Sequence, residues 1–262
     1  MPNPRPPTRW KNAAEDKHDT KKYAGPRLSL QFLGRLPEIQ RRLQKLLHVP
    51  QPDGLKVDPT DIHRCTSTWG RPLKWQREAE KAGELRSVFA CSYSDFFLSE
   101  ADAWRDDAWA LIRITRNLIF LLASKRTDLI ADRLPPDWGS GYPNVWLGTS
   151  AEMKKYLFRL DELRKIPCVL RWLDFAPCLE DLMPDLADHI DGYDWVNVSG
   201  KQGCGLVVPR PFDPDWARNI RDLCSERGIA FSYPSSGGKR PVPFPLLDGV
   251  RHNAMPPLSK RF

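Results

Sequence analysis

From residue 86 onward, short apolar runs alternate with longer amphipathic segments. The apolar runs predict six strands, over 86–94, 118–126, 144–152, 168–178, 193–200 and 229–234. Because these runs are continuously apolar instead of alternating with polar residues, both faces of each strand are expected to be buried, as in a parallel sheet.

The amphipathic segments predict helices over 36–47, 102–117, 153–166 and 213–228, and a short helix-like segment over 179–190. The last long helix carries boundary signals: Asp213 as N-cap, Pro214 at the first helical position and Gly228 at the C-terminal end. Residues 61–85 mix tryptophan with both signs of charge and give no firm assignment.

Strands that alternate with helices predict an α/β fold. Its two forms are a closed or partial (β/α) barrel and an open, doubly wound sheet. A dinucleotide-binding fold is not favoured, because Gly200, Gly203 and Gly205 reverse the usual spacing and no helix follows them. We expect three regions: a basic N-terminal arm and helix over 1–60, a (β/α) barrel domain over 61–240, and a Pro-rich, basic tail over 241–262.

The net charge of +7 on the 262 residues is concentrated at the N-terminus. Residues 1–50 contain eleven Lys and Arg against four Asp and Glu, whereas the remaining residues contain 29 of each sign. Such a basic segment is typical of nucleic-acid contact, although a solvated leader has the same composition. The predicted nucleic-acid contacts are Arg9, Lys11, Lys21, Lys22, Arg41 and Arg42.

Apolar runs and cysteine spacing limit the compartment and the metal content. No stretch approaches the ~20 apolar residues of a membrane helix, and the N-terminus has no apolar signal segment. We therefore expect a cytoplasmic protein with no membrane partner. The six cysteines lack the close pairs that structural zinc and iron–sulfur sites use, so no metal site is expected. A centre built from the distant Cys178, Cys204 and Cys224 is the alternative.

Polar residues follow the predicted strands, and ligands of parallel α/β folds bind at the carboxyl ends of strands. Asp174 lies inside an apolar run, where a carboxylate needs a partner; Arg171 or a lysine at this rim is expected to supply it. Rim residues are also often caps or solvated loop residues. The predicted catalytic residues are Asp95, Glu152 and Asp174, and the predicted ligand-binding residues are Lys125, Arg126, Ser199, Gly200, Lys201, Gln202 and Gly203.

Several segments together resemble one known family. These are SVFACSYSDFF, FLLASKRTD, NVWLGTSAE, IPCVLRWLDFAPCLEDL, YDWVNVSG and PDWARNIRDLCSERGIAF, which follow in the family's order over about residues 69–240. The family is phage-associated, is named after two phage gene products, numbers thirty-seven and sixty-eight, and is related to radical-SAM barrels. The resemblance implies a partial (β/α) barrel of radical-SAM type, with S-adenosylmethionine as the cofactor.

The departures from the family pattern affect the expected chemistry. No cysteine precedes Cys65, so the family's N-terminal three-cysteine cluster is missing. The usual glutamate of the glycine loop is replaced in Gly200-Lys201-Gln202, and the usual glutamate-proline has become Asp174-Phe175-Ala176-Pro177. The usual lysine near the end of the last strand is also absent from FSYPSSGG. We therefore expect no iron–sulfur cluster and no radical chemistry, and a loop that favours phosphate or carboxylate.

Two functions are consistent with this sequence. The first is a divergent, cluster-less phage or mobile-element barrel that binds a nucleotide or nucleic acid, and that either modifies it by non-radical chemistry or has lost catalysis. The second is a catalytically inactive scaffold that binds a protein partner through its ten tryptophans and proline-rich tails. Trp146, Trp172 and Trp195 lie inside strand patterns, however, and are expected in the core.

Overall fold

The structure is a computed structural model that describes residues 64, 66–91, 94–203 and 208–258. The expected arm over 1–60, the helix over 36–47, and Cys65, Cys204 and Gly205 lie outside the described residues. So do the six cations predicted to contact nucleic acid: Arg9, Lys11, Lys21, Lys22, Arg41 and Arg42.

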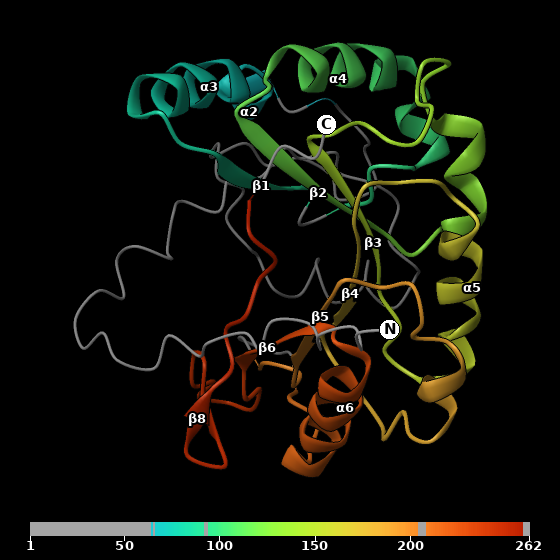
Figure 1. Ribbon diagram of the computed structural model, residues 1–262, viewed down its shortest axis with the longest axis vertical. Coiled ribbons are helices and arrows are strands. Elements are labelled where there is room, and N and C mark those ends of the chain that lie inside the picture. The colour runs from blue at the N-terminus through green and yellow to red at the C-terminus, as the bar shows by residue number, and fades with distance from the viewer. Residues whose placement is uncertain (1–63, 65, 92–93, 204–207, 259–262) are drawn as a thin grey trace, which may run out of the picture.

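Six parallel strands form one sheet in the order of the chain, from β1 to β6. Their bounds are β1 (Arg86–Ala90), β2 (Leu118–Ser124), β3 (Val145–Thr149), β4 (Arg171–Phe175), β5 (Trp195–Ser199) and β6 (Ala230–Ser235). Each strand pairs with the next strand of the chain, and the sheet is curled (Figure 1). In a doubly wound sheet, by contrast, later strands are added on the other side of the first strand. The prediction of a partial (β/α) barrel is confirmed, and the doubly wound alternative is wrong.

The α-helices pack around the outer, convex face of the sheet (Figure 1). They are α2 (Thr66–Trp69), α3 (Arg71–Ala82), α4 (Asp102–Ile114), α5 (Phe158–Arg164) and α6 (Pro214–Arg227). The short 3-10 turns are η1 (Ser99–Ala101), η2 (Thr127–Leu129), η3 (Ala131–Arg133), η4 (Lys154–Tyr156) and η5 (Asp185–Asp188).

Helix boundaries agree with the sequence where a cap is present. In α6, the Asp213 side chain accepts a hydrogen bond from the Asp215 backbone N–H, and Gly228 ends the helix in the left-handed region with φ 69°. In contrast, the helix expected over 153–166 begins as the 3-10 turn η4, and only η5 forms within 179–190. Neither α5 nor η5 has a side-chain N-cap, so no local signal sets where they begin.

The two faces of the sheet bury separate apolar clusters. Outward-facing side chains pack with the helices, whereas the concave face buries Trp146, Trp172 and Trp195 with neighbouring aliphatic residues. These three tryptophans are core residues, as the sequence predicts. Along the strands the same face then changes from apolar to polar, because Asp174 lies two residues beyond Trp172 and Asn197 two residues beyond Trp195.

The C-terminal region returns to the concave face instead of extending as a free tail. The strands β7 (Leu246–Leu247) and β8 (Val250–Arg251) form an antiparallel hairpin. Beyond it, the His252 carbonyl accepts a hydrogen bond from the Tyr233 backbone N–H. Met255 and Leu258 then pack against the tryptophan cluster. The last red segment of Figure 1 accordingly runs from β8 towards β1 across the open side of the sheet.

Within the described part of the chain, no helix combines the length and the apolar character that crossing a bilayer requires.

Candidate functional site

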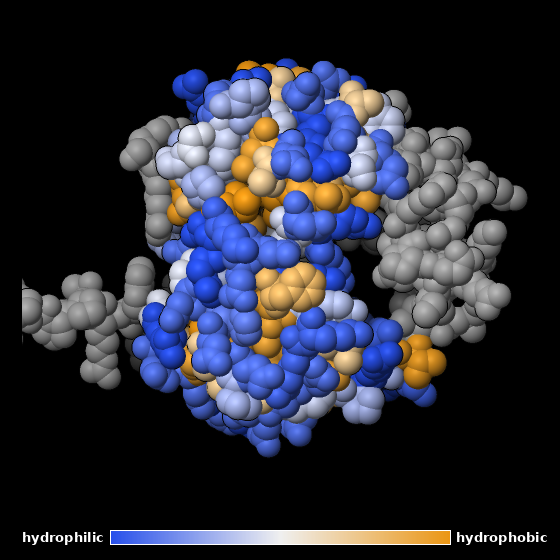
Figure 2. Space-filling model, turned by 90° about the vertical axis from the view of Figure 1, so that its right-hand side faces the viewer, coloured by the Kyte–Doolittle hydropathy of each residue, from blue (hydrophilic) through white to orange (hydrophobic). Residues whose placement is uncertain are grey.

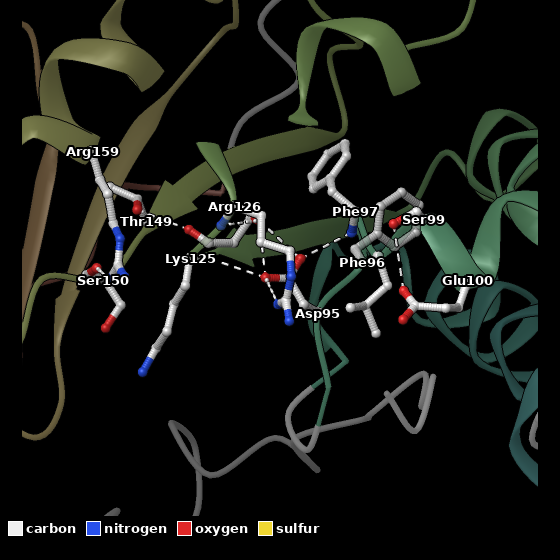
Figure 3. Close-up of polar contacts among 12 residues, drawn as sticks. Asp95, Phe96, Phe97, Ser99, Glu100, Lys125, Arg126, Thr149, Ser150 and Arg159 are labelled. Atoms are coloured by element: carbon white, nitrogen blue, oxygen red, sulfur yellow. Dashed lines mark hydrogen bonds and ion pairs between the residues drawn. The ribbon is translucent and has the colours of Figure 1, made fainter. Parts of the chain in front are cut away.

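The carboxyl ends of β1, β2 and β3 bring four of the predicted site residues together. Asp95 follows β1, Lys125 and Arg126 follow β2, and Glu152 follows β3. Asp95 is joined to Lys125 and Arg126 (Figure 3), and Lys125 pairs with Glu152. Parallel neighbouring strands end at one edge of the sheet, which is why residues about 30 positions apart in sequence become neighbours.

Asp95 is the most extensively bonded carboxylate of this rim. Its Oδ1 accepts hydrogen bonds from the Phe97 backbone N–H at 2.9 Å and from the Ser124 hydroxyl at 2.8 Å. Its Oδ2 accepts from the Lys125 backbone N–H at 3.0 Å and from the Arg126 guanidinium at 3.2 Å. Since the side chain is only 8% exposed and both oxygens are engaged, Asp95 holds the ends of β1 and β2 in place.

Aromatic packing fixes the loop that carries Asp95. Phe96 and Phe97 are fully buried, and their ring centroids lie 4.9 Å and 6.4 Å from that of Trp109 on α4. The buried Arg105 of α4 donates to the Phe96 carbonyl at 2.5 Å and also to the Leu98 carbonyl. The sequence Asp-Phe-Phe therefore anchors the loop on the outer side and turns the carboxylate towards the rim.

Glu152 joins two cations at the end of β3. Its Oε1 pairs with the Lys125 Nζ, and its Oε2 lies 3.4 Å from the Arg159 guanidinium. The Glu152 and Arg159 side chains are 11% and 13% exposed, whereas half of the Lys125 side chain remains open. Burial, followed by the positive charge of Arg159, lowers the pKa of Lys125, while the carboxylates of Asp174 and Asp95 oppose this shift.

Arg159 is a site residue that the sequence analysis missed. It lies on α5 and donates to the Ser150 carbonyl at 2.8 Å, while its guanidinium carbon lies 4.2 Å from the centre of the Tyr156 ring. Burial lowers its pKa from the ordinary arginine value. In sequence, Arg159 looks like one of the solvated basic residues of an amphipathic helix; the only signal is its position seven residues after Glu152.

Of the two partners expected for Asp174, Arg171 or a rim lysine, the structure does not support Arg171. Arg171 donates to the backbone carbonyls of Leu163, Arg164 and Ile166, on the side of the sheet where α5 ends. The two residues are three positions apart on one strand, so their side chains leave opposite faces. Asp174 is instead close enough to Lys125 to act on its pKa, which agrees with the alternative of a rim lysine.

The glycine loop after β5 packs against the corresponding loop after β6. A Cβ on Gly200 would lie 2.6 Å from the Ser236 carbonyl oxygen and 2.9 Å from Phe212, and a Cβ on Gly237 would lie 2.7 Å from the Gly200 Cα. Close contact between two backbones therefore explains Gly200 without any ligand.

Backbone hydrogen bonds continue the pairing of these two loops beyond the strands. The Gly203 N–H donates to the Gly238 carbonyl, and the Gly238 N–H donates to the Lys201 carbonyl, both at 2.9 Å. The Gln202 side chain is directed to the Ser235 hydroxyl at 3.0 Å. The buried Ser199 gives its carbonyl to the Cys178 backbone N–H. The Lys201 side chain is half-buried, and among the described residues it forms no hydrogen bond or ion pair.

Gly200→Ala is expected to lower the free energy of unfolding by about 1–3 kcal/mol, because the added Cβ forces the two loops apart. Urea unfolding followed by tryptophan fluorescence measures the change. Gly70→Ala is the matched control, since nothing lies within 4 Å of a Cβ there and Gly70 has an ordinary φ of −82°. Equal stabilities of the two variants would show that the loops do not pack as described.

The absence of a metal site and the binding of S-adenosylmethionine stay predictions, because two of the six cysteines, Cys65 and Cys204, lie outside the described residues. No three or more His, Cys, Asp or Glu side chains in this part of the chain are grouped to hold a metal ion. Burial raises the pKa of Cys178 and Cys224 to about 12, which favours the protonated thiols in the absence of a metal ion. The glycine loop offers Lys201 and Gln202, and no carboxylate, to the amino group of S-adenosylmethionine.

Comparisons with known proteins give one family match and two structural likenesses. The model of the family described as "Protein of unknown function (DUF5131)" matches residues 37–256. None of the curated proteins matches this sequence significantly.

The two solved structures are both of spore photoproduct lyase. A cysteine-to-serine mutant has 11% identity and a TM-score of 0.42, covering 68% of this chain and 70% of its own. The complex with dinucleoside spore photoproduct has 14% identity and a TM-score of 0.41, covering 71% of this chain and 57% of its own. Likenesses at this level carry no argument about the function of this protein.

Proposed function

This chain belongs to the DUF5131 family, and from this premise we propose that its barrel rim binds the phosphate group of a nucleotide or nucleic acid. The proposal includes the cytoplasm as the compartment and, from the resemblance in sequence, a phage or mobile-element context. It rests on this chain's own rim residues and takes nothing from the spore photoproduct lyases.

The observation that carries the proposal is the way Arg126 is held. One of its terminal nitrogens pairs with the buried Asp95, while the side chain as a whole is 36% exposed. Asp95 is itself fixed by the Phe97, Ser124 and Lys125 donors, so the guanidinium is oriented before any ligand arrives. A pre-oriented guanidinium with free donors is suited to bind phosphate oxygens.

Two lysines add positive charge at the carboxyl ends of the strands. Lys125 is the adjacent residue and is half exposed. Lys201 lies in the loop after β5, where the related barrels carry a glutamate. Each carboxylate described at this rim acts on a cation, as Asp95 does on Arg126 and Glu152 on Lys125 and Arg159. We propose that Lys201 supplies the net positive charge that an anion requires.

We assign different roles to the three predicted catalytic carboxylates. Asp95 has both oxygens engaged in structural bonds, so we assign it to positioning Arg126. Glu152 pairs with an exposed amine, and Asp174 lies on the polar part of the concave face. If the bound nucleotide is modified, these two are the carboxylates placed to transfer protons.

Arg126→Gln is expected to weaken the binding of fluorescein-labelled single-stranded DNA about tenfold at low salt, because one charge-assisted contact is lost. Fluorescence anisotropy over a series of salt concentrations measures both affinity and salt dependence. The slope of log affinity against log salt concentration should become less steep by an amount that corresponds to roughly one phosphate contact. A labelled nucleoside triphosphate, used in parallel, separates nucleotide binding from nucleic-acid binding.

Arg113→Gln is the matched control for this experiment. Arg113 is also an exposed, ion-paired arginine, but it lies on α4 and pairs with Asp137. This variant should bind like the unaltered protein. Undetectable binding of both ligands at low salt, or equal losses in the two variants, would refute the phosphate site.

The scaffold alternative finds less support in the described surface. Six of the tryptophans are buried and cannot anchor a partner: Trp75, Trp109, Trp138, Trp146, Trp172 and Trp195. Large exposed hydrophobic residues are scattered, for example Ile114 on α4, Phe158 on α5 and Leu246 in the hairpin. The face that carries α5 is accordingly mostly hydrophilic, with hydrophobic residues in small areas (Figure 2).

A further inference from the structure

Lys125 is placed differently from a lysine that only binds an anion. Its Nζ contacts the carboxylate of Glu152, yet half of the side chain is open at the rim. In Figure 3 the Lys125 side chain points away from the Asp95 carboxylate. An exposed amine in contact with a buried carboxylate has both a route to a ligand and a group that exchanges protons with it.

Two fixed cations act against the protonated form of this amine. Arg126 is held by Asp95, and Arg159 is held by the Ser150 carbonyl and by Glu152. Both guanidinium groups keep their charge at neutral pH. Burial and this repulsion lower the pKa of Lys125, although the carboxylates of Asp174 and Asp95 oppose the shift, and a lower pKa increases the fraction of the neutral, nucleophilic amine.

A second observation lies beside the same groups. The Ser150 hydroxyl is buried and has no hydrogen-bond partner in the described structure, although its carbonyl binds Arg159. Burying a hydroxyl without a hydrogen-bond partner lowers the stability of the folded protein. A hydrogen bond from this hydroxyl to a ligand oxygen would explain why it has no partner in the protein.

We infer that the Lys125 amine forms an imine with an aldehyde that lies next to a phosphate group. This inference rests on the proposed phosphate site, with Arg126 binding the phosphate. Two sources carry this chemistry: an abasic deoxyribose within a nucleic-acid strand, and a free phosphorylated aldehyde.

The reaction balances without an oxidant or reductant. The neutral Nζ attacks the carbonyl carbon, so a C–N bond forms and the carbonyl π electrons move to oxygen. Glu152 transfers a proton from nitrogen to oxygen twice: the first transfer gives the neutral carbinolamine, and the second takes the remaining N–H proton and delivers it to the hydroxyl, which leaves as water. The product is the imine, and the same groups release it by adding water in reverse.

Borohydride trapping tests this inference on the full-length protein. The probes are glyceraldehyde 3-phosphate and an oligonucleotide with one abasic site; glyceraldehyde and the intact oligonucleotide are the controls. Mass spectrometry of the digested protein is expected to find the reduced adduct on Lys125. Trapping should increase with pH, with a midpoint below that of an ordinary lysine. The probe that reacts faster identifies the source of the aldehyde.

Lys125→Arg and Lys154→Arg are the matched variants. Arginine keeps the charge of Lys125 but removes the amine, so trapping should fall about tenfold or more. Lys154 is also partly exposed and ion-paired, with Asp185, but it lies on η4, so its variant should react normally. Because the adduct is mapped on the unaltered protein, the result holds even if Lys125→Arg folds poorly.

The outcomes separate this inference from the proposed function. Adducts spread evenly over the lysines, or unchanged in Lys125→Arg, would overturn the imine while leaving DNA binding intact. Equal trapping of glyceraldehyde and its phosphate at Lys125 would instead support a reactive amine and count against the phosphate site on which the inference rests.

Discussion

Asp95→Ala is expected to lower the free energy of unfolding by about 3–5 kcal/mol, because it removes a buried carboxylate and leaves the groups that donate to it without an acceptor. Four groups lose their acceptor: the Ser124 hydroxyl, the Phe97 and Lys125 N–H groups, and the Arg126 guanidinium. The last two begin the segment after β2, so we also expect the rim to lose its fixed shape and its affinity for phosphate.

Chemical denaturation with circular dichroism and tryptophan fluorescence measures the loss of stability. Asp107→Ala is the matched control, because Asp107 also pairs with an arginine, Arg64, but its side chain is 61% exposed. An exposed pair contributes about 0–1 kcal/mol. If the two variants lose equal stability, Asp95 does not organise the rim.

Gly148→Ala is expected to destabilise the protein by about 3 kcal/mol, at the upper end of the usual cost of overpacking. Gly148 lies on the concave face of β3, and a Cβ there would lie 2.4 Å from the Trp172 indole. Trp172 is 1% exposed, donates its indole N–H to the Trp146 carbonyl at 3.2 Å, and packs against Trp195 with ring centroids 5.6 Å apart. The indole therefore has no free space into which it can move.

A double-mutant cycle tests this reason directly. Trp172→Leu removes the ring that the new methyl group would meet, so Gly148→Ala should cost much less in that background. We expect a coupling energy of about 1–2 kcal/mol from thermal or urea unfolding of the four proteins. Additive effects would mean that the glycine is required for another reason, such as the backbone conformation of β3.

Some elements could not be assigned from the sequence because their patterns depend on distant partners. Helix α3 buries Pro72, Trp75, Gln76 and Ala79, and a buried glutamine weakens the apolar periodicity that signals a helix. The Gln76 side chain is satisfied by the Asn117 backbone N–H at 2.7 Å, 41 positions later in the chain. Nothing local to residues 71–82 reveals this partner.

The sequence by itself determined the strands, their burial on both faces and the rim at which they end. Continuous apolar runs identify buried parallel strands, and the polar residue after each run must lie at the carboxyl edge. This reasoning located Asp95, Lys125, Arg126 and Glu152. The prediction was possible because hydrophobic periodicity and chain direction depend only on residues that are close together in the sequence.

Only the tertiary structure decided which of these residues meet and what each one does. It joined Glu152 to Arg159, turned Arg171 away from Asp174, and placed Gly200 against Gly237. It also showed that the tail covers the tryptophan cluster with Met255 and Leu258. These contacts join residues far apart in the chain or on opposite faces, and they are set by the curl of the sheet and by side-chain volume. The spacing of residues along the sequence does not encode either property.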